Sequence, residues 1–123
     1  MPSKKTILLV DDEPAILKVL AIKLKISGYE VVLASSGEEA LGLLTAARPD
    51  LALLDVILPG MDGLELLRKV RSFSKMPVIV FSARPENAAA ALKSGADDFL
   101  CKPFDTDTLM GKIQTLLYAP HVQ

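Results

Sequence analysis

TILLVDDE, residues 6–13, joins a short run of strand-forming residues to three acidic ones. Its apolar positions follow one another without alternation, which is typical of a strand covered on both faces of a parallel sheet. Pro14 then opens an amphipathic stretch, and proline is favoured in the first turn of a helix. These residues predict a buried strand, an acidic loop and a helix, in that order.

The same order of short apolar run and amphipathic stretch recurs five times along the chain. The expected strands are 6–10, 31–34, 51–54, 78–81 and 99–101; the expected helices are 14–27, 36–47, 63–73, 85–94 and 105–118. Helix 14–27 should end at Gly28, where a left-handed backbone is accessible. Regular alternation of strands and helices predicts an α/β fold with a doubly wound, five-stranded parallel sheet and helices on both faces.

Length and composition narrow the class of protein. The 123 residues, half of them apolar, fit one domain spanning 1–123. A net charge of -1 gives no general attraction to nucleic acid or to an anionic membrane, so direct nucleic-acid binding is not expected. No apolar run reaches the roughly 18 residues that a membrane span needs, and we expect a cytoplasmic protein. The single cysteine, Cys101, should pack as a small hydrophobic residue.

Reactive side chains follow four of the five expected strands. Asp11 and Asp12 follow the first, Asp55 the third, Ser82 the fourth and Lys102 the fifth. Because the carboxyl ends of parallel strands meet at one edge of the sheet, these groups should converge there. Three carboxylates attract a hard divalent cation, and magnesium binds through one or two carboxylates together with phosphate oxygens. The sequence therefore predicts a magnesium site that accepts a phosphate-bearing partner.

Four segments, in this order, resemble the receiver domains of response regulators. They read ILLVDDE (7–13), LLDVILPGMDG (53–63), VFSA (80–83) and GADDFLCKPF (95–104). The resemblance implies a flavodoxin-like sheet with strand order 2-1-3-4-5 and a role in two-component signalling. It implies a switch that takes a phosphoryl group from the phosphohistidine of a sensor histidine kinase or phosphotransfer protein. Such a domain catalyses only its own phosphorylation and slow dephosphorylation.

The resemblance also implies a role for each residue of the metal and acceptor site. Asp55 matches the phosphoryl acceptor, and it also contributes to the magnesium site. Asp12 matches the direct magnesium ligand and Asp11 a ligand that acts mainly through water. Ile57, two residues after the acceptor, would give its backbone carbonyl to the metal.

A second group of residues matches the switch of the family. Ser82 corresponds to the hydroxyl that turns toward the phosphoryl group, and Lys102 to the ammonium that pairs with a phosphoryl oxygen. Phe99 corresponds to the aromatic residue that reports phosphorylation to the far face. The Lys102–Pro103 peptide bond is implied to be cis, a geometry that X-Pro bonds tolerate.

Simpler structural roles compete with some of these. Asp11 or Asp12 could cap the first helix, and Ser82 could cap the fourth. Phe99 could serve only as a core residue. The chain as a whole could be a degenerate receiver that acts only as an interaction module; the presence of Asp11, Asp12, Asp55, Ser82 and Lys102 counts against this alternative.

Helix 14–27 carries more apolar residues than one buried stripe needs. Ile16, Leu20 and Leu24 are expected to face the core, which leaves Leu17 and Ile22 outside. We expect Leu17 and Ala21, with Pro103 and Phe104 nearby, to contact the helical bundle that carries the kinase's phosphohistidine.

The region of the fourth helix, fifth strand and fifth helix is a candidate face for output and for a homodimer. It carries charged residues of both signs: Lys93, Asp97, Asp98 and Lys112. A solvated surface of mixed charge is an equally good interpretation of this pattern.

Overall fold

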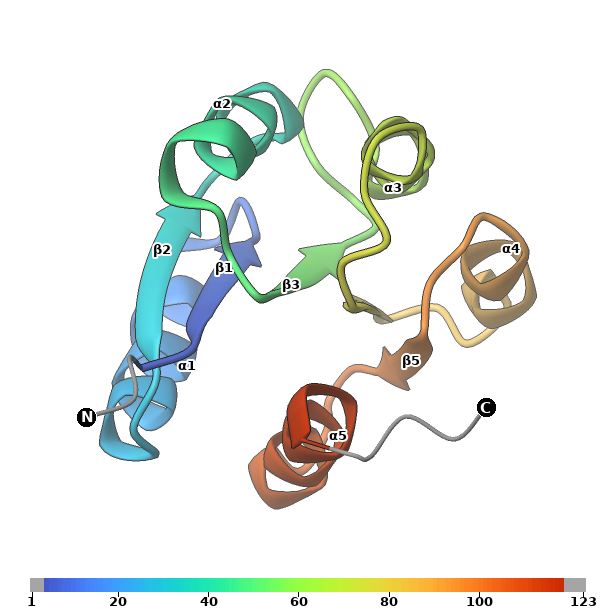
Figure 1. Cartoon of the computed structure of the whole chain (residues 1–123). Coiled ribbons are helices and arrows are strands. Elements are labelled where there is room, and N and C mark those ends of the chain that lie inside the picture. Colours follow the sequence, from blue (N-terminus) through green and yellow to red (C-terminus); the bar gives the residue numbers. More distant parts are fainter. Residues whose placement is uncertain (1–3, 119–123) are drawn as a thin grey trace.

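The computed structural model describes residues 4–118 and consists of a parallel five-stranded sheet between two layers of helices (Figure 1). The strand order is β2-β1-β3-β4-β5, which confirms the expected topology. The elements are β1 (Thr6–Val10), α1 (Pro14–Ile26), β2 (Glu30–Ala34), α2 (Gly37–Ala47), β3 (Leu51–Asp55), α3 (Gly63–Arg71), β4 (Val78–Ser82), α4 (Asn87–Lys93), β5 (Asp98–Cys101) and α5 (Thr106–Tyr118). Within residues 4–118, no helix is both long and apolar enough to cross a membrane.

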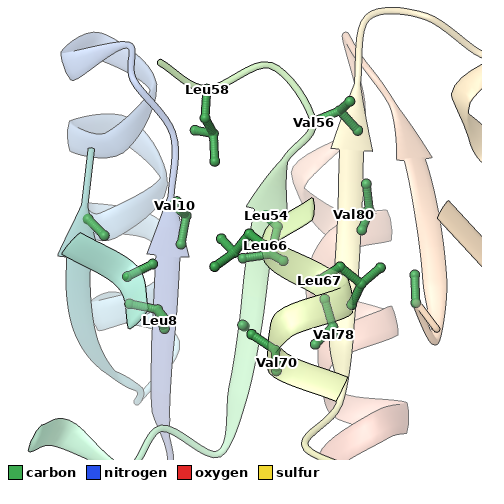
Figure 2. Close-up of a cluster of buried hydrophobic side chains, with 14 of the residues drawn as sticks. Leu8, Val10, Leu54, Val56, Leu58, Leu66, Leu67, Val70, Val78 and Val80 are labelled. Carbon is green, nitrogen blue, oxygen red and sulfur yellow. The ribbon is translucent and has the colours of Figure 1, made fainter. Parts of the chain in front are cut away.

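The two faces of the sheet bury two separate apolar clusters. Side chains alternate along each strand, so Leu8 and Val10 point to one face and Ile7 and Leu9 to the other. The first face is covered by α2, α3 and α4, and Figure 2 shows Leu8, Val10, Leu54, Val80 and their neighbours packed beneath α3. The second face is covered by α1 and α5, through Leu20, Leu24, Leu109 and Ile113. Both faces of the sheet are therefore buried, as the continuous apolar runs predict.

Strand register places the chemically active residues at one edge. Val10 pairs with Leu54, Asp55 with Phe81, and Ser82 with Cys101. The residues that follow β1 and β5 therefore lie level with the last residues of β3 and β4.

Local signals account for most helix boundaries. Gly28 has a φ of 97° just after α1, as expected from its sequence position. The α2 helix begins with a reciprocal cap, in which Ser36 Oγ accepts from Glu39 N at 3.2 Å and Glu39 Oε1 accepts from Ser35 N at 2.7 Å. Arg48 adopts the left-handed conformation after the last turn.

Beyond shifts of one residue at element ends, the fourth helix, the third helix and Cys101 differ from expectation. The fourth helix begins at Asn87 instead of Pro85, because the chain first makes a tight turn in which Asn87 N donates to Arg84 O at 3.0 Å. The third helix ends at Arg71, which leaves Phe73 exposed. Cys101 is exposed instead of packed, since β5 is an edge strand.

Arg71 ties together the loops at the edge of the sheet opposite the reactive residues. Its guanidinium donates to Gly95 O at 2.9 Å, Met76 O at 2.6 Å and Asp97 Oδ2 at 2.9 Å. Asp97 Oδ2 also accepts from Val78 N at 2.8 Å. One side chain thus joins the end of α3, the start of β4 and the turn that follows α4.

Gly63 allows α3 to begin directly against the end of β3. Its N–H donates to Val56 O at 2.7 Å. A Cβ at this position would meet the Asp55 carbonyl oxygen and would lie 2.7 Å from Val56 Cα. These neighbours are backbone atoms of the segment that carries Asp55, so they cannot move aside without displacing Asp55.

Gly63→Ala is therefore expected to lower the free energy of unfolding by about 1–3 kcal/mol, the usual range for overpacking. Gly42→Ala in α2 is the matched control, because a Cβ there meets nothing within 4 Å. The control should stabilise the protein by about 0.5–1 kcal/mol through helix propensity. Urea unfolding of both variants measures the difference, and equal effects would contradict the close approach at Gly63.

Candidate functional site

Three carboxylates meet at the carboxyl edge of the sheet. Asp11, Asp12 and Asp55 each offer an oxygen, and these oxygens lie within 4.8 Å of one another. Asp11 and Asp55 are buried, at 0% and 5% exposure, whereas Asp12 is exposed. A cluster of hard oxygen donors with one open side has the chemistry that Mg²⁺ requires.

Lys102 lies between two of these carboxylates. Its Nζ donates to Asp55 Oδ2 at 3.1 Å and to Asp11 Oδ2 at 3.2 Å. The same ammonium lies 4.9 Å from the ring centre of Phe81, within the range of a cation–π interaction. The ammonium therefore lies against the Asp55 and Asp11 carboxylates at the end of the sheet.

Backbone amides orient the two buried carboxylates. Asp11 Oδ1 accepts from Glu13 N at 2.8 Å, and Asp55 Oδ1 accepts from Ile57 N at 3.2 Å. Asp11 therefore has both oxygens engaged, whereas Asp12 pairs with no other side chain among the described residues. This difference suits Asp12 for direct contact with a metal and Asp11 for an indirect role.

The capping alternative for the acidic pair is wrong. The residue before α1 is Glu13, and its side chain makes no capping hydrogen bond. Asp11 accepts from the amide of Glu13 itself, within the loop, and not from the first turn of the helix.

Burial and charge act in opposite directions at Asp55. Burial raises the pKa of the Asp55 carboxyl; the hydrogen bonds from Lys102 and Ile57 N lower it, the negative charge of Asp11 raises it, and the net pKa lies above the ordinary value. Burial lowers the pKa of the Lys102 ammonium. Its contacts with Asp55 and Asp11 raise this pKa by more, so the net pKa lies above the ordinary value. Lys102 thus stays charged, while the Asp55 carboxylate carries a cost of burial.

Ser82 is buried beside the acidic cluster, at the end of β4. Its Oγ accepts from Arg84 N at 3.1 Å and from Asn87 Nδ2 at 2.9 Å. The cap of α4 is Glu86, so Ser82 does not cap this helix as the structural alternative supposed.

The loop after β5 has the expected shape. The Lys102–Pro103 peptide bond is cis. The Phe104 ring packs edge-on against Phe81, with ring centres 5.8 Å apart. Phe99 is half-buried and packs against the cluster beneath α2, α3 and α4, as its alternative role as a core residue predicts.

The expected docking residues on α1 require correction. Ala21 is buried and Leu17 packs against the core, because the core-facing stripe of α1 is wider than three residues. An apolar groove instead runs beside Lys102, between α1 and the loop after β5. Its lining residues are Ala15, Ile16, Val19, Leu20, Ala83, Lys102, Pro103, Phe104 and Thr106. Pro103 and Phe104 therefore border this groove, whereas Ala21 is buried and Leu17 only partly exposed; contact of these residues with a kinase stays a prediction.

The charged residues of the α4, β5 and α5 region are largely paired within the chain. Asp98 Oδ2 accepts from Lys112 Nζ at 2.8 Å. Asp97 pairs with Arg71, at the opposite edge of the sheet from the acidic cluster. Lys93 lies exposed at the end of α4.

Comparison with known proteins agrees with this geometry. The family model described as "Response regulator receiver domain" matches residues 7–114. The chain belongs to this family. It is 41% identical over 119 residues to the transcriptional regulatory protein AfsQ1 of Streptomyces coelicolor, covering 95% of this chain and 52% of that protein. It is 43% identical over 114 residues to the response regulator MprA of Mycolicibacterium vanbaalenii, covering 90% and 49%.

Solved receiver domains share the fold closely. A CheY-like response regulator receiver domain protein of Methanospirillum hungatei is 38% identical with a TM-score of 0.87, covering 94% of each chain. The BeF3-activated N-terminal receiver domain of Klebsiella pneumoniae RstA is 29% identical with a TM-score of 0.88, covering 92% of this chain and 98% of that chain. The receiver therefore belongs to two-component signalling, as a phosphoacceptor switch and not a conventional enzyme. It spans about half the length of the curated relatives it matches.

Two residues of the site were not singled out from the sequence. Phe81 supports Lys102 through its ring, and Asn87 donates to Ser82. Phe81 precedes Ser82 in the apolar run of β4, and its register partner Leu100 lies two residues before Lys102. That spacing is a signal for Phe81, whereas Asn87 has none, because its contact depends on the turn before α4.

The raised pKa of Asp55 predicts a stability effect. A raised folded-state pKa means that the carboxylate is less stable in the folded chain than in the unfolded chain. The charge therefore destabilises the fold where both states are ionised, and this loss is relieved as the pH falls through the folded-state pKa. Without divalent cations, Asp55→Asn should raise the free energy of unfolding by about 1 kcal/mol, a common size for single substitutions.

Asp107→Asn provides the control, because Asp107 is exposed and its ion pair with Lys23 is long, at 4.0 Å between Oδ1 and Nζ. It should change stability by less than about 0.5 kcal/mol. Thermal unfolding with and without Mg²⁺ measures both effects, and Mg²⁺ should stabilise the parent more than Asp55→Asn. A destabilised Asp55→Asn in cation-free buffer would contradict the cost assigned to the carboxylate.

Proposed function

We propose that this receiver is a switch that accepts a phosphoryl group onto Asp55 from the phosphohistidine of a sensor histidine kinase or phosphotransfer protein. The observation that carries the proposal is the contact of Asp55 Oδ2 with Lys102 Nζ at 3.1 Å, inside a cluster of three carboxylates. An activated carboxylate next to a fixed cation is the arrangement that in-line phosphoryl transfer needs.

The acidic cluster fits a magnesium ion. Asp12 and Asp55 would hold it through carboxylate oxygens, Ile57 through its backbone carbonyl, and Asp11 through water. When bound, magnesium supplies positive charge that neutralises the phosphoryl oxygens during transfer.

The chain's own residues supply the rest of the reaction. A carboxylate oxygen of Asp55 attacks phosphorus while the bond from phosphorus to the histidine nitrogen breaks, which yields an acyl phosphate and free histidine. Lys102 keeps its proton and pairs with a phosphoryl oxygen. Ser82 then turns its hydroxyl to a second phosphoryl oxygen, and Phe99 moves with it.

The output of the switch lies on the face of α4, β5 and α5. Movement of Ser82 and Phe99 changes this face, which controls an output partner or domain and offers a homodimer surface. The similarity to AfsQ1, named a transcriptional regulatory protein, supports a transcriptional output. A degenerate receiver acting only as an interaction module is the alternative, and the completeness of the acidic cluster with Lys102 argues against it.

Phosphorylation of Asp55 is directly testable. With Mg²⁺ and a small-molecule phosphodonor, the parent should gain one phosphoryl group by intact mass. Asp55→Asn should gain none, because an amide oxygen is a poor nucleophile at phosphorus. Asp107→Asn should label like the parent. Labelling that persists in Asp55→Asn, or an unlabelled parent, would refute the proposal.

The apolar groove beside Lys102 is the proposed docking surface for the kinase's helical bundle. Its open side offers apolar contacts from α1 and from Pro103 and Phe104, next to the acceptor. Val19 takes the place first expected for Leu17, because its side chain is 61% exposed and lines the groove.

Val19→Glu should slow transfer from a histidine kinase at least about tenfold, as expected for a charge placed in an apolar contact. Labelling by a small phosphodonor should be unaffected, because Val19 does not touch the carboxylates. Ile26→Glu, 78% exposed at the far end of the same helix, is the matched control. A kinase chosen from a panel for its fastest transfer to the parent provides the assay; equal slowing by both variants would contradict this docking surface.

A further inference from the structure

The Ser82 hydroxyl is held from the side of α4 by two donors. Asn87 Nδ2 lies 2.9 Å and Arg84 N 3.1 Å from Ser82 Oγ. A hydroxyl oxygen has two acceptor positions, so both are used. Ser82 is fully buried and Asn87 is the first residue of α4. One side-chain hydrogen bond therefore joins the hydroxyl directly to the helix.

The start of α4 makes few other side-chain contacts. The helix has seven residues, its cap Glu86 makes no side-chain capping bond, and Ala91 is its one buried residue. A short helix with few buried contacts belongs to the least stable parts of a fold. Backbone bonds from Asn87 N to Arg84 O and from Ala88 N to Pro85 O shape the turn itself, and the Asn87–Ser82 bond ties this first turn to β4.

We propose that Asn87 is a positioning residue that latches Ser82 and the first turn of α4 in the resting arrangement, and that this bond breaks when Asp55 is phosphorylated. The inference rests on the proposed function, in which Ser82 turns toward the phosphoryl group. A bond that exists only in the resting state stabilises that state alone, so its loss shifts the population toward the active state. The latch thus sets how readily the receiver responds.

Asn87→Ala removes the donor and is expected to raise the rate of Asp55 labelling by a small phosphodonor with Mg²⁺ about fivefold. That factor corresponds to one net neutral hydrogen bond. Affinity for beryllofluoride, a phosphoryl analogue, should rise by a similar factor, because the variant populates the binding-competent state more. Asn87→Leu keeps a similar side-chain size without the donor and should show the same gain.

Two controls isolate the latch from other effects. Glu86→Gln alters the neighbouring residue, which makes no side-chain capping bond, and should leave the rate and affinity unchanged. In a Ser82→Ala background the acceptor is gone, so adding Asn87→Ala should change neither quantity further. A gain that persists in that background would show that Asn87 acts through the helix alone and would overturn the latch.

Labelling of the parent distinguishes a failure of the proposed function from a failure of the latch. A parent that is not labelled at Asp55 would refute the proposed function itself. A parent that is labelled normally, with Asn87→Ala and Asn87→Leu both unchanged, would overturn only the latch. Nuclear magnetic resonance supplies an independent readout, since the side-chain amide signals of Asn87 should shift when beryllofluoride binds to the parent.

Discussion

The structure depends on holding like charges together at one edge of a buried sheet. Two carboxylate charges no more than 4.8 Å apart repel by at least roughly 3.5 kcal/mol at an effective dielectric of about 20. Lys102 offsets part of this repulsion by bridging Asp11 and Asp55. Parallel register and burial on both faces keep the three elements that carry these residues from separating. The fold thus holds the three carboxylates together. Without a divalent cation, their repulsion lowers the stability of the folded chain.

Most of the fold could be predicted from the sequence because its signals are local and agree with one another. Five apolar runs gave the strands, and the residues that follow them gave Asp11, Asp12, Asp55, Ser82 and Lys102. The start of α4 was missed because a turn at Pro85 competes with helix at that point. Leu17 and Ala21 were misplaced because periodicity gives a helix stripe but not its width or its rotation about the axis. Asn87 could not be found, since its contact depends on side-chain direction after an irregular turn.

Phe81 connects the acidic cluster to the apolar groove beside Lys102. One ring supports the Lys102 ammonium and packs edge-on against Phe104, which lines the groove. The acidic cluster with Lys102 and the groove beside it therefore share an aromatic support, the Phe81 ring. Shape at the groove and charge at the site are fixed by the same core residue.

Arg71 gives the two ends of α4 different mechanical roles. Its bonds to Gly95, Met76 and Asp97 anchor the turn after the helix, whereas the beginning of the helix is joined to Ser82 by one side chain. A short rod pinned at one end cannot slide; it can only pivot. Under the proposed function, a small displacement of Ser82 would then tilt α4 about its anchored end. In that motion the Arg71 guanidinium would hold the C-terminal end of α4 in place while its N-terminal end moves.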